Sequence, residues 1–243
     1  IPAQNAGRAK HEIFMFRQEK SNWPLTSFKP APLFTFPHTF ILALLAAFHF
    51  SISRSVHYSG WLDKGRSSAD TILTGDLRGT ITALTLHGDD AHLVGNILFL
   101  WILSNAVSGY IGYGIGWLFI LFSGAGGNLL NALFYQTAHN SIGASTALFG
   151  ALGLVAGFRL RLNSSMDLSF KQKYLPLLPL FALLALTGAD PKSDIMAHFF
   201  GCIFGTILGL SSSKFVVFEL KNNTKFQLGA LALFWFTIVL AWQ

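Results

Sequence analysis

The sequence has few cysteines and few charged residues. Its single cysteine, Cys202, excludes an intramolecular disulfide and a cluster of thiolate metal ligands. Only 12% of the 243 residues are Asp, Glu, Lys or Arg, whereas 52% are hydrophobic. A typical soluble domain has about 25% charged residues. We therefore expect a protein with a largely apolar surface and no disulfide framework.

The charged residues are missing from four long stretches of the chain. Asp, Glu, Lys and Arg occur nowhere in residues 91–158, 174–189, 195–213 or 226–243. The mean hydropathy is +0.49. A helix that crosses a bilayer needs about 20 predominantly apolar residues, and these stretches supply several such helices. The sequence therefore predicts an all-α polytopic membrane protein.

Apolar runs separated by polar segments predict seven membrane-spanning helices. They divide the chain into an N-terminal segment (1–36), a six-helix core (37–212) with a long first loop (54–90), and a loop with a seventh helix (213–243). We place the spans at residues 37–53, 91–109, 114–135, 143–158, 174–188, 195–212 and 226–242.

The basic residues set the expected orientation. The net charge is +6, and the segments 1–36, 159–173 and 214–225 hold 12 of the 17 Lys and Arg residues. The positive-inside rule then places the N-terminus and these loops in the cytoplasm, in a multi-pass protein of the cell (inner) membrane. Because the basic residues lie between apolar spans, we expect the lipid bilayer and no nucleic acid as a partner. We also expect no cleaved signal peptide, since the first long apolar run follows residue 36.

Polar side chains converge near the outer face in this topology. The second span carries His92 and Asn96, which lie one turn apart on one helix face. The fourth span carries Ser145 near its start, and the sixth carries His198 near its start. All three spans enter from the outer face, so we expect the four side chains at a similar depth.

Small residues predict close packing of the fourth span on the sixth. Gly201, Gly205 and Gly209 recur every four residues and form a flat groove for another helix. Packing the fourth span into that groove would bring Ser145 and His198 within reach of each other. The small residues that we assign to the facing stripe are Gly143, Ala147, Gly150, Ala151 and Gly157.

A serine and a histidine in this arrangement suggest nucleophilic catalysis. A neutral imidazole takes the proton of a serine hydroxyl and so activates the oxygen for attack. The resulting oxyanion needs donors, which the Ser145 amide, Asn96 and His92 would supply. No carboxylate lies in these spans to orient His198, so the pattern predicts a Ser-His dyad rather than a triad.

Other interpretations of the same residues stay open at this stage. A single histidine or asparagine in a membrane helix often only hydrogen-bonds a neighbouring helix. A metal site at His87, His92 and His198 lacks a carboxylate or a second helical histidine pair, so we expect no metal and no cofactor. A proton or ion pathway is the third possibility, since intramembrane polar residues mark such pathways.

Four motifs in order resemble the rhomboid family of intramembrane serine proteases, over residues 76–210. The motifs are TALTLHG at 82–88 followed by HLVGN (HxxxN) at 92–96, SGAGGNLL at 123–130, GAS (GxS) at 143–145, and AHFFGCIFG (AHxxGxxxG) at 197–205.

The resemblance implies a fold and an activity. The fold is a rhomboid-like six-helix core with a water-accessible cavity that opens outward, plus one additional C-terminal transmembrane helix. Ser145 is the implied nucleophile and His198 the general base, with His92, Asn96 and the Ser145 amide as the oxyanion hole. The implied activity is cleavage of single-span membrane proteins near the outer face. The alternative is a non-proteolytic rhomboid-like protein that binds membrane clients.

Two positions depart from the family pattern. Thr146 follows the implied nucleophile where many members have glycine, and its bulk would alter the oxyanion pocket or the substrate path. Leu77-Arg78 stands in the first loop where the family often has a Trp-Arg pair, and it lies one residue further from His87. This difference bears on how the loop is anchored and not on the Ser-His dyad.

Overall fold

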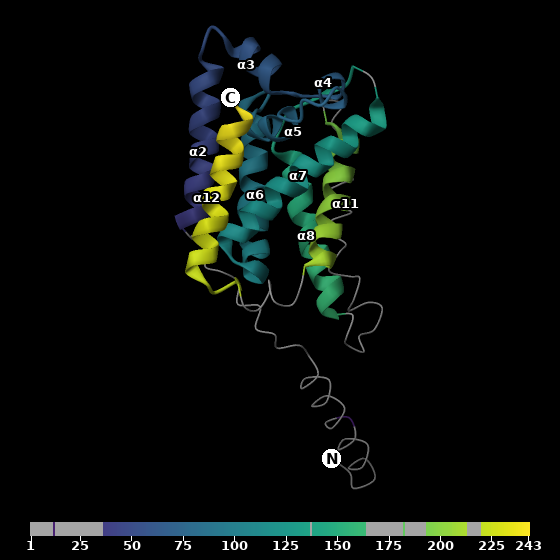
Figure 1. The fold of residues 1–243 in the computed structure, drawn as a ribbon. Helices are drawn as coiled ribbons and strands as arrows, with labels where there is room; N and C mark the ends of the chain where they lie inside the picture. Colours follow the sequence, from purple (N-terminus) through teal and green to yellow (C-terminus); the bar gives the residue numbers. More distant parts are fainter. Residues whose placement is uncertain (1–11, 13–35, 137, 164–181, 183–192, 213–219) are drawn as a thin grey trace, which may run out of the picture.

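The protein is a bundle of long helices with several short helices at one end (Figure 1). The computed structural model describes residues 12, 36–136, 138–163, 182, 193–212 and 220–243. The predicted all-α, multi-span architecture is confirmed within these residues. The long helices are α2 (Phe36–Ser53), α6 (Asp90–Ile111), α7 (Tyr113–Tyr135), α8 (Ser145–Asn163), α11 (Ile195–Ser211) and α12 (Thr224–Ala241).

Five of the predicted spans agree with these helices to within two residues at each end. By length and composition, α2, α6, α7 and α12 can each cross a membrane, and α11 is a shorter apolar helix. The predicted fifth span, 174–188, lies outside the described residues except for residue 182, as does nearly all of the N-terminal segment.

The fourth span is displaced from its predicted bounds at both ends. It begins at Ser145 rather than at Gly143, because Gly143 has a φ of +127°, which is incompatible with a right-handed helix. It continues to Asn163, so Arg159 and Arg161 lie on the helix and not in the predicted loop. Arg161 Nη1 donates to the Leu210 carbonyl at 2.6 Å, which ties the end of α8 to α11.

The most extensive helix contact is between α8 and α11, and glycines set the distance between them. A Cβ atom at Gly205 would overlap the carbonyl oxygen of Gly150. On the facing helix, a Cβ at Gly153 would overlap the carbonyl oxygen of Cys202. The two backbones therefore lie in direct contact, which is the packing that small residues allow in membranes.

The residues that α8 contributes to this contact differ in part from the predicted stripe. Gly150 and Gly157 lie against α11 as expected, and Gly153, which the prediction omitted, lies there too. Ala147 instead packs against Gly124 of α7. The helix is thus held by small residues on two faces, one toward α11 and one toward α7.

The last helix, α12, is attached to the bundle by one buried glutamine. Gln227 is 2% exposed, and its Oε1 accepts from the amides of Gly114 at 2.7 Å and Ile115 at 3.1 Å. Its Nε2 donates to the carbonyl oxygens of Ile111 and Leu220, each at 3.0 Å. The bonds to Ile111, Gly114 and Ile115 satisfy backbone groups at the turn between α6 and α7, which the helix ends would otherwise leave unpaired. The bond to Leu220 holds the segment that precedes α12.

The two histidines of α2 face the protein rather than the lipid. His38 and His49 are both fully buried. Trp117 Nε1 of α7 donates to His38 Nδ1 at 2.8 Å, and His49 Nε2 lies 3.0 Å from Asp90 Oδ1 at the start of α6. These two polar residues of an otherwise apolar span thus hold it against its neighbours.

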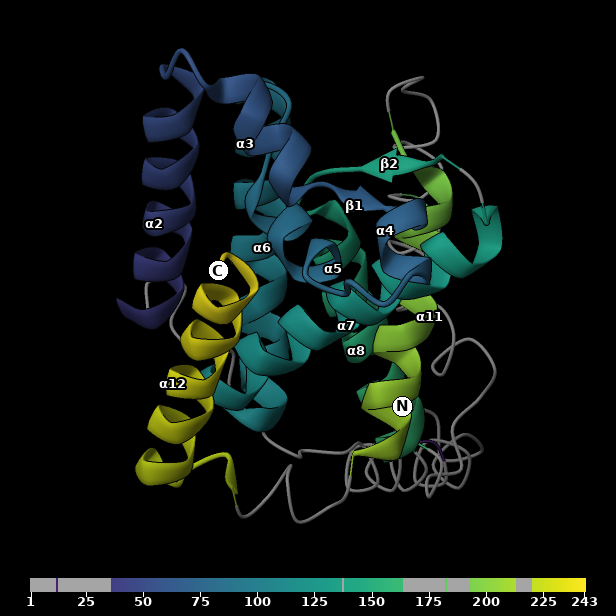
Figure 2. The same cartoon turned by 45° about the horizontal axis from the view of Figure 1, so that its top comes forward.

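The predicted long first loop contains short elements of its own (Figure 2). The strand β1 (Ser67–Ser68) pairs antiparallel with the strand β2 (Asn140–Ser141). This pairing joins the first loop to the segment just before Ser145. The elements are α3 (Tyr58–Gly65), β1 (Ser67–Ser68), α4 (Ala69–Leu73), α5 (Gly79–Thr82) and the 3-10 helix η2 (Ala83–Thr85), with β2 at Asn140–Ser141.

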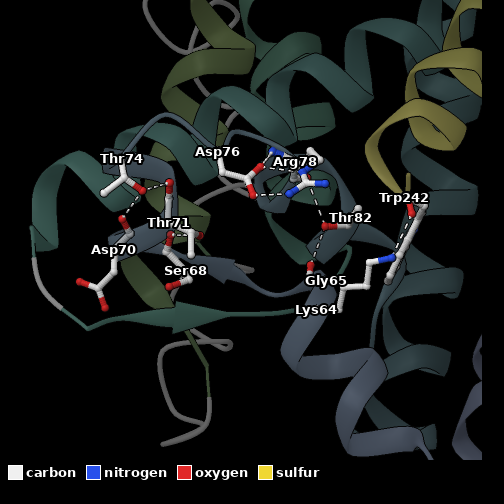
Figure 3. Close-up of polar contacts among 10 residues, drawn as sticks. All are labelled: Lys64, Gly65, Ser68, Asp70, Thr71, Thr74, Asp76, Arg78, Thr82 and Trp242. Carbon is white, nitrogen blue, oxygen red and sulfur yellow. Dashed lines mark hydrogen bonds and ion pairs between the residues drawn. The ribbon is translucent and has the colours of Figure 1, made fainter.

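Polar contacts within the first loop replace the expected Trp-Arg anchor (Figure 3). Thr82 Oγ1 donates to the Gly65 carbonyl at 2.7 Å, which joins α5 to α3. Arg78 makes a bidentate contact with Asp76, with Nε to Oδ1 at 2.8 Å and Nη2 to Oδ2 at 2.6 Å. Asn128 of α7 donates to the Thr80 carbonyl at 2.9 Å. The loop is therefore fixed to the bundle.

The glycine contact yields a prediction about stability. We expect Gly205→Ala to lower the free energy of unfolding by about 1–3 kcal/mol, because its Cβ forces α8 and α11 apart. Thermal unfolding in detergent measures the change. Gly229→Ala on α12 is the matched control, since no atom lies within 4 Å of its added Cβ. Equal unfolding temperatures for the two variants would contradict the close contact.

Candidate active site

The predicted serine and histidine lie in direct contact. Ser145 is the first residue of α8, and His198 lies in the first turn of α11. The Ser145 Oγ is 2.8 Å from His198 Nε2. A neutral imidazole that accepts the hydroxyl proton at Nε2 carries its own proton on Nδ1. The pair thus has the geometry that a general base needs toward a nucleophile.

An aromatic ring fixes the plane of the imidazole. His198 is 4% exposed and stacks on Phe149, with ring centroids 4.4 Å apart and planes inclined by 19°. Phe149 lies one helical turn after Ser145, so the same helix face supplies both contacts to the ring. The sequence analysis missed Phe149, although its i+4 spacing from the serine was a usable signal.

Asp194 connects the helix of His198 to two other segments. Its Oδ1 caps α11 by accepting from the Ala197 amide at 3.1 Å. Its Oδ2 accepts from Asn131 Nδ2 of α7 at 2.8 Å and lies 2.7 Å from His139 Nε2. Burial alone would raise the pKa of Asp194, but hydrogen bonds from His139, Ala197 and Asn131 outweigh burial, so the pKa lies below its usual value. Asp194 therefore stays ionised and holds the start of α11 in place.

In the part of the chain that the structure describes, no carboxylate lies within hydrogen-bond or ion-pair distance of His198. The polar atom near His198 Nδ1 is Ser193 Oγ, at 3.5 Å. This distance is long for a hydrogen bond between a hydroxyl and a ring nitrogen. The arrangement is therefore a serine–histidine pair oriented by ring stacking and by the capped start of α11.

The segment before Ser145 brings His92 to the site. Gly143 donates its amide to the Ala83 carbonyl at 2.9 Å. A Cβ atom at Gly143 would lie 2.8 Å from His92 Nε2 and 3.5 Å from Ser145 Oγ. Glycine is required here both by the positive φ and by the close approach of the imidazole. The His92 ring thus packs against Gly143, two residues before Ser145.

Asn96 offers a buried donor one turn after His92 on α6. The side chain is 5% exposed, and its Nδ2 has no hydrogen-bond partner in the structure. An unpaired buried amide is costly, so such a group in a folded protein needs an explanation.

His87 supports the segment that precedes the serine. It is fully buried, and its Nε2 accepts from the Ala144 amide at 3.4 Å. Its ring lies 5.2 Å from that of His92 and 6.0 Å from that of His49. Burial lowers the pKa of His87 to about 3. The nearby His92 and His49 lower this pKa further, whereas Asp89 raises it. A neutral, structural imidazole follows from this environment.

The described residues contain no group of three or more His, Cys, Asp or Glu side chains placed to hold a metal ion. His198 contacts Ser145, whereas His87 contacts the Ala144 amide. Of the three histidines considered as a metal site, His87 and His198 thus have separate hydrogen-bond partners.

Thr146 occupies the interface between helices and not the space beside Ser145. It is 2% exposed. Its methyl group faces Gly127 of α7 and Gly201 of α11, where an added Cβ would lie 2.7 and 3.1 Å from it. Two glycines on neighbouring helices thus accommodate the bulk that distinguishes Thr146 from glycine.

Comparisons with known proteins place the sequence in a family. A family model described as the Rhomboid domain matches residues 74–215, more than half of the chain. The chain is 33% identical to RHOMBOID-like protein 1 of Arabidopsis thaliana over 151 residues, 59% of this chain and 37% of that protein. RHOMBOID-like protein 6, mitochondrial, of the same organism is 35% identical over 132 residues, 53% of this chain and 41% of that protein.

A bacterial relative matches over more of its length. The Bacillus subtilis (strain 168) protein named "Putative rhomboid protease YdcA" is 26% identical over 171 residues, 70% of this chain and 85% of that protein. The chain spans only about two fifths of the length of the plant relatives, so those proteins contain further sequence that this chain does not match.

The environment of His87 predicts a pH dependence of stability. In the unfolded chain this histidine takes up a proton below about pH 6.5, but in the folded protein only below about 3. The unfolded state therefore binds more protons between these values, and stability falls as the pH is lowered through that window. The loss is at most about 1.4 kcal/mol per pH unit.

Thermal unfolding in detergent between pH 7.5 and pH 4.5 tests this. We expect the unfolding temperature of His87→Gln to fall less steeply with decreasing pH than that of the wild type. His57→Gln removes an exposed histidine and is expected to keep the wild-type slope. A wild-type slope in His87→Gln would mean that other groups cause the pH dependence.

Proposed function

The chain belongs to the rhomboid family, and from that premise we propose that it is an intramembrane serine endopeptidase. In this proposal Ser145 is the nucleophile and His198 is the general base. The observation that carries it is the 2.8 Å distance between Ser145 Oγ and His198 Nε2.

The chemistry follows from that contact. His198 takes the hydroxyl proton as Ser145 Oγ attacks the carbonyl carbon of the scissile bond. The imidazolium then gives the proton to the leaving amine, and a serine ester remains. Water attacks the ester with His198 again as the base, which releases the acid and restores the hydroxyl. Stacking on Phe149 supports this cycle, because it keeps the ring plane fixed through both proton transfers.

The oxyanion is stabilised by donors around the serine. The Ser145 amide lies at the N-terminus of α8, where backbone N–H groups are free to bind an anion. Asn96 supplies the unpaired Nδ2, and His92 lies against Gly143 beside the hydroxyl. Donors of this kind act on charge that develops only in the transition state.

The substrates in this proposal are single-span membrane proteins. The chain is an integral multi-pass membrane protein, so a bond that reaches Ser145 comes from a segment that enters the bilayer region. We infer that segments with small residues and weak helix propensity are cut, since their backbone unwinds readily into the site. We further propose a cell (inner) membrane location, with residues 1–36 in the cytoplasm and the site toward the outer face.

A fluorophosphonate probe tests the proposed nucleophile. Such probes attach covalently to serines that a base activates, so we expect labelling of the detergent-purified wild type. Ser145→Ala and His198→Ala remove the nucleophile and the base, and neither is expected to react. Ser193→Ala is the matched control, because it changes a serine near the imidazole whose contact is long. Absence of labelling in folded wild-type protein would favour the client-binding alternative.

The rate of the same labelling tests the oxyanion donor. We expect Asn96→Ala to slow phosphonylation of Ser145 by roughly 10²–10³-fold, the usual effect of removing one such donor. Asn105→Ala on the same helix is the control, since its Nδ2 already donates to the Trp101 carbonyl at 2.7 Å. An Asn96→Ala protein that reacts at the wild-type rate would exclude this role.

A further inference from the structure

An apolar cavity borders the start of α8, the helix that carries Ser145. Its volume is about 290 Å³, and it lies between α2, α12 and the bundle. The two helices run side by side in both views (Figures 1 and 2), while α2 packs mainly on α6 and α12 mainly on α7. Its lining includes Leu45 of α2, Ile238 of α12 and, at the inner wall, Ala144 and Ala147.

The lining is almost entirely apolar, and its polar side-chain groups are already hydrogen-bonded within the protein. Trp117 Nε1 is bonded to His38, and Trp242 Nε1 donates to Thr85 Oγ1 at 3.2 Å. The Thr85 hydroxyl in turn donates to the Thr82 carbonyl at 2.7 Å. Cavities without polar partners stay dry, and an empty cavity forfeits the dispersion contacts of its walls. An apolar occupant is therefore favoured over water or a vacancy.

The surroundings of the cavity favour one kind of apolar occupant. A flexible hydrocarbon chain adapts to an irregular space between helices, whereas a further helix would have to enter as a rigid body about 10 Å wide. The bilayer around α2 and α12 supplies hydrocarbon chains.

One end of the cavity has the side chains of a membrane interface. Phe48, Trp61 and Trp242 contact one another, with ring centroids 5.4 to 6.0 Å apart. Aromatic residues of this kind lie at the level of lipid headgroups. Lys64 Nζ donates to the Trp242 carbonyl at 3.4 Å beside this cluster (Figure 3).

Lys64 is a cation that remains available at that level. Arg66 pairs with Asp63 at 3.1 Å and Arg78 with Asp76 at 2.6 Å. Among the residues that the structure describes, no carboxylate lies within ion-pair distance of Lys64. An ammonium group above an apolar cavity complements a phosphate attached to an acyl chain.

We propose that an acyl chain of a membrane phospholipid occupies this cavity, with its phosphate beside Lys64. The chain contacts Ala144 and Ala147 of the segment around Ser145, while the serine hydroxyl faces His198 on another side. The lipid therefore fills the space behind the nucleophile without touching it. This inference does not depend on the proposed proteolysis.

Photocrosslinking tests the occupant directly. The full chain is placed in nanodiscs of phosphatidylcholine that contain a trace of phosphatidylcholine with a diazirine in one acyl chain. After irradiation, mass spectrometry maps the lipid adducts. We expect adducts on the cavity-lining residues Leu45 and Ile238.

Variants on α12 separate the cavity from the general lipid surface. Ile238→Trp fills the cavity, so we expect cavity adducts to fall by about tenfold or more. Val239→Trp adds the same ring at the next position, which is 57% exposed and faces outward, and is expected to leave them unchanged. If Ile238→Trp does not fold, Leu45→Trp against Phe40→Trp makes the same comparison on α2.

The outcomes are distinct. Adducts that stay at wild-type level in Ile238→Trp, or that fall equally in Val239→Trp, overturn the proposal. Adducts on outward-facing residues alone also overturn it. For the headgroup, Lys64→Gln is expected to lower cavity adducts about two- to fivefold, as for an exposed ion pair. Unchanged adducts in Lys64→Gln would remove the phosphate contact.

Discussion

The direct backbone contact between α8 and α11 is the constraint on which the site depends. Ser145 and His198 lie on different helices, and a hydrogen bond of 2.8 Å between them allows little change in helix separation. Gly205 against Gly150 sets that separation, because neither helix has a side chain there to hold them apart. Lipid tails give helices no hydrophobic reason to associate, so such fitted surfaces provide the attraction themselves.

The segment that leads into Ser145 is held by parts of the chain outside the long helices. His87 holds the Ala144 amide, and Ala83 holds the amide of Gly143. The β1–β2 pair joins the first loop to the same segment. Because irregular backbone must satisfy its polar groups within the protein, these contacts also explain why the first loop has short helices.

Much of this was predictable because the patterns are strong. Charge-free runs locate the spans, and glycines four residues apart indicate which face of α11 packs closely. What the sequence did not reveal depends on three-dimensional neighbours. Nothing near Thr146 in the chain indicates that glycines on two other helices accommodate its methyl group. Gln227 and the β1–β2 pair likewise act through partners far away in the chain, and no local periodicity indicates such pairings.

The surroundings of α8 show how the bilayer can influence the site. On one side α11 contacts the helix through backbone, and on another α7 packs Gly124 against Ala147. Before the helix, His87 and Ala83 fix the approaching chain. The helix α6 also packs against α8. Near its start, α8 borders the apolar cavity through Ala147, with Ala144 just before it. In our proposal an acyl chain fills that cavity, so the lipid adds to the packing that holds Ser145 at its distance from His198.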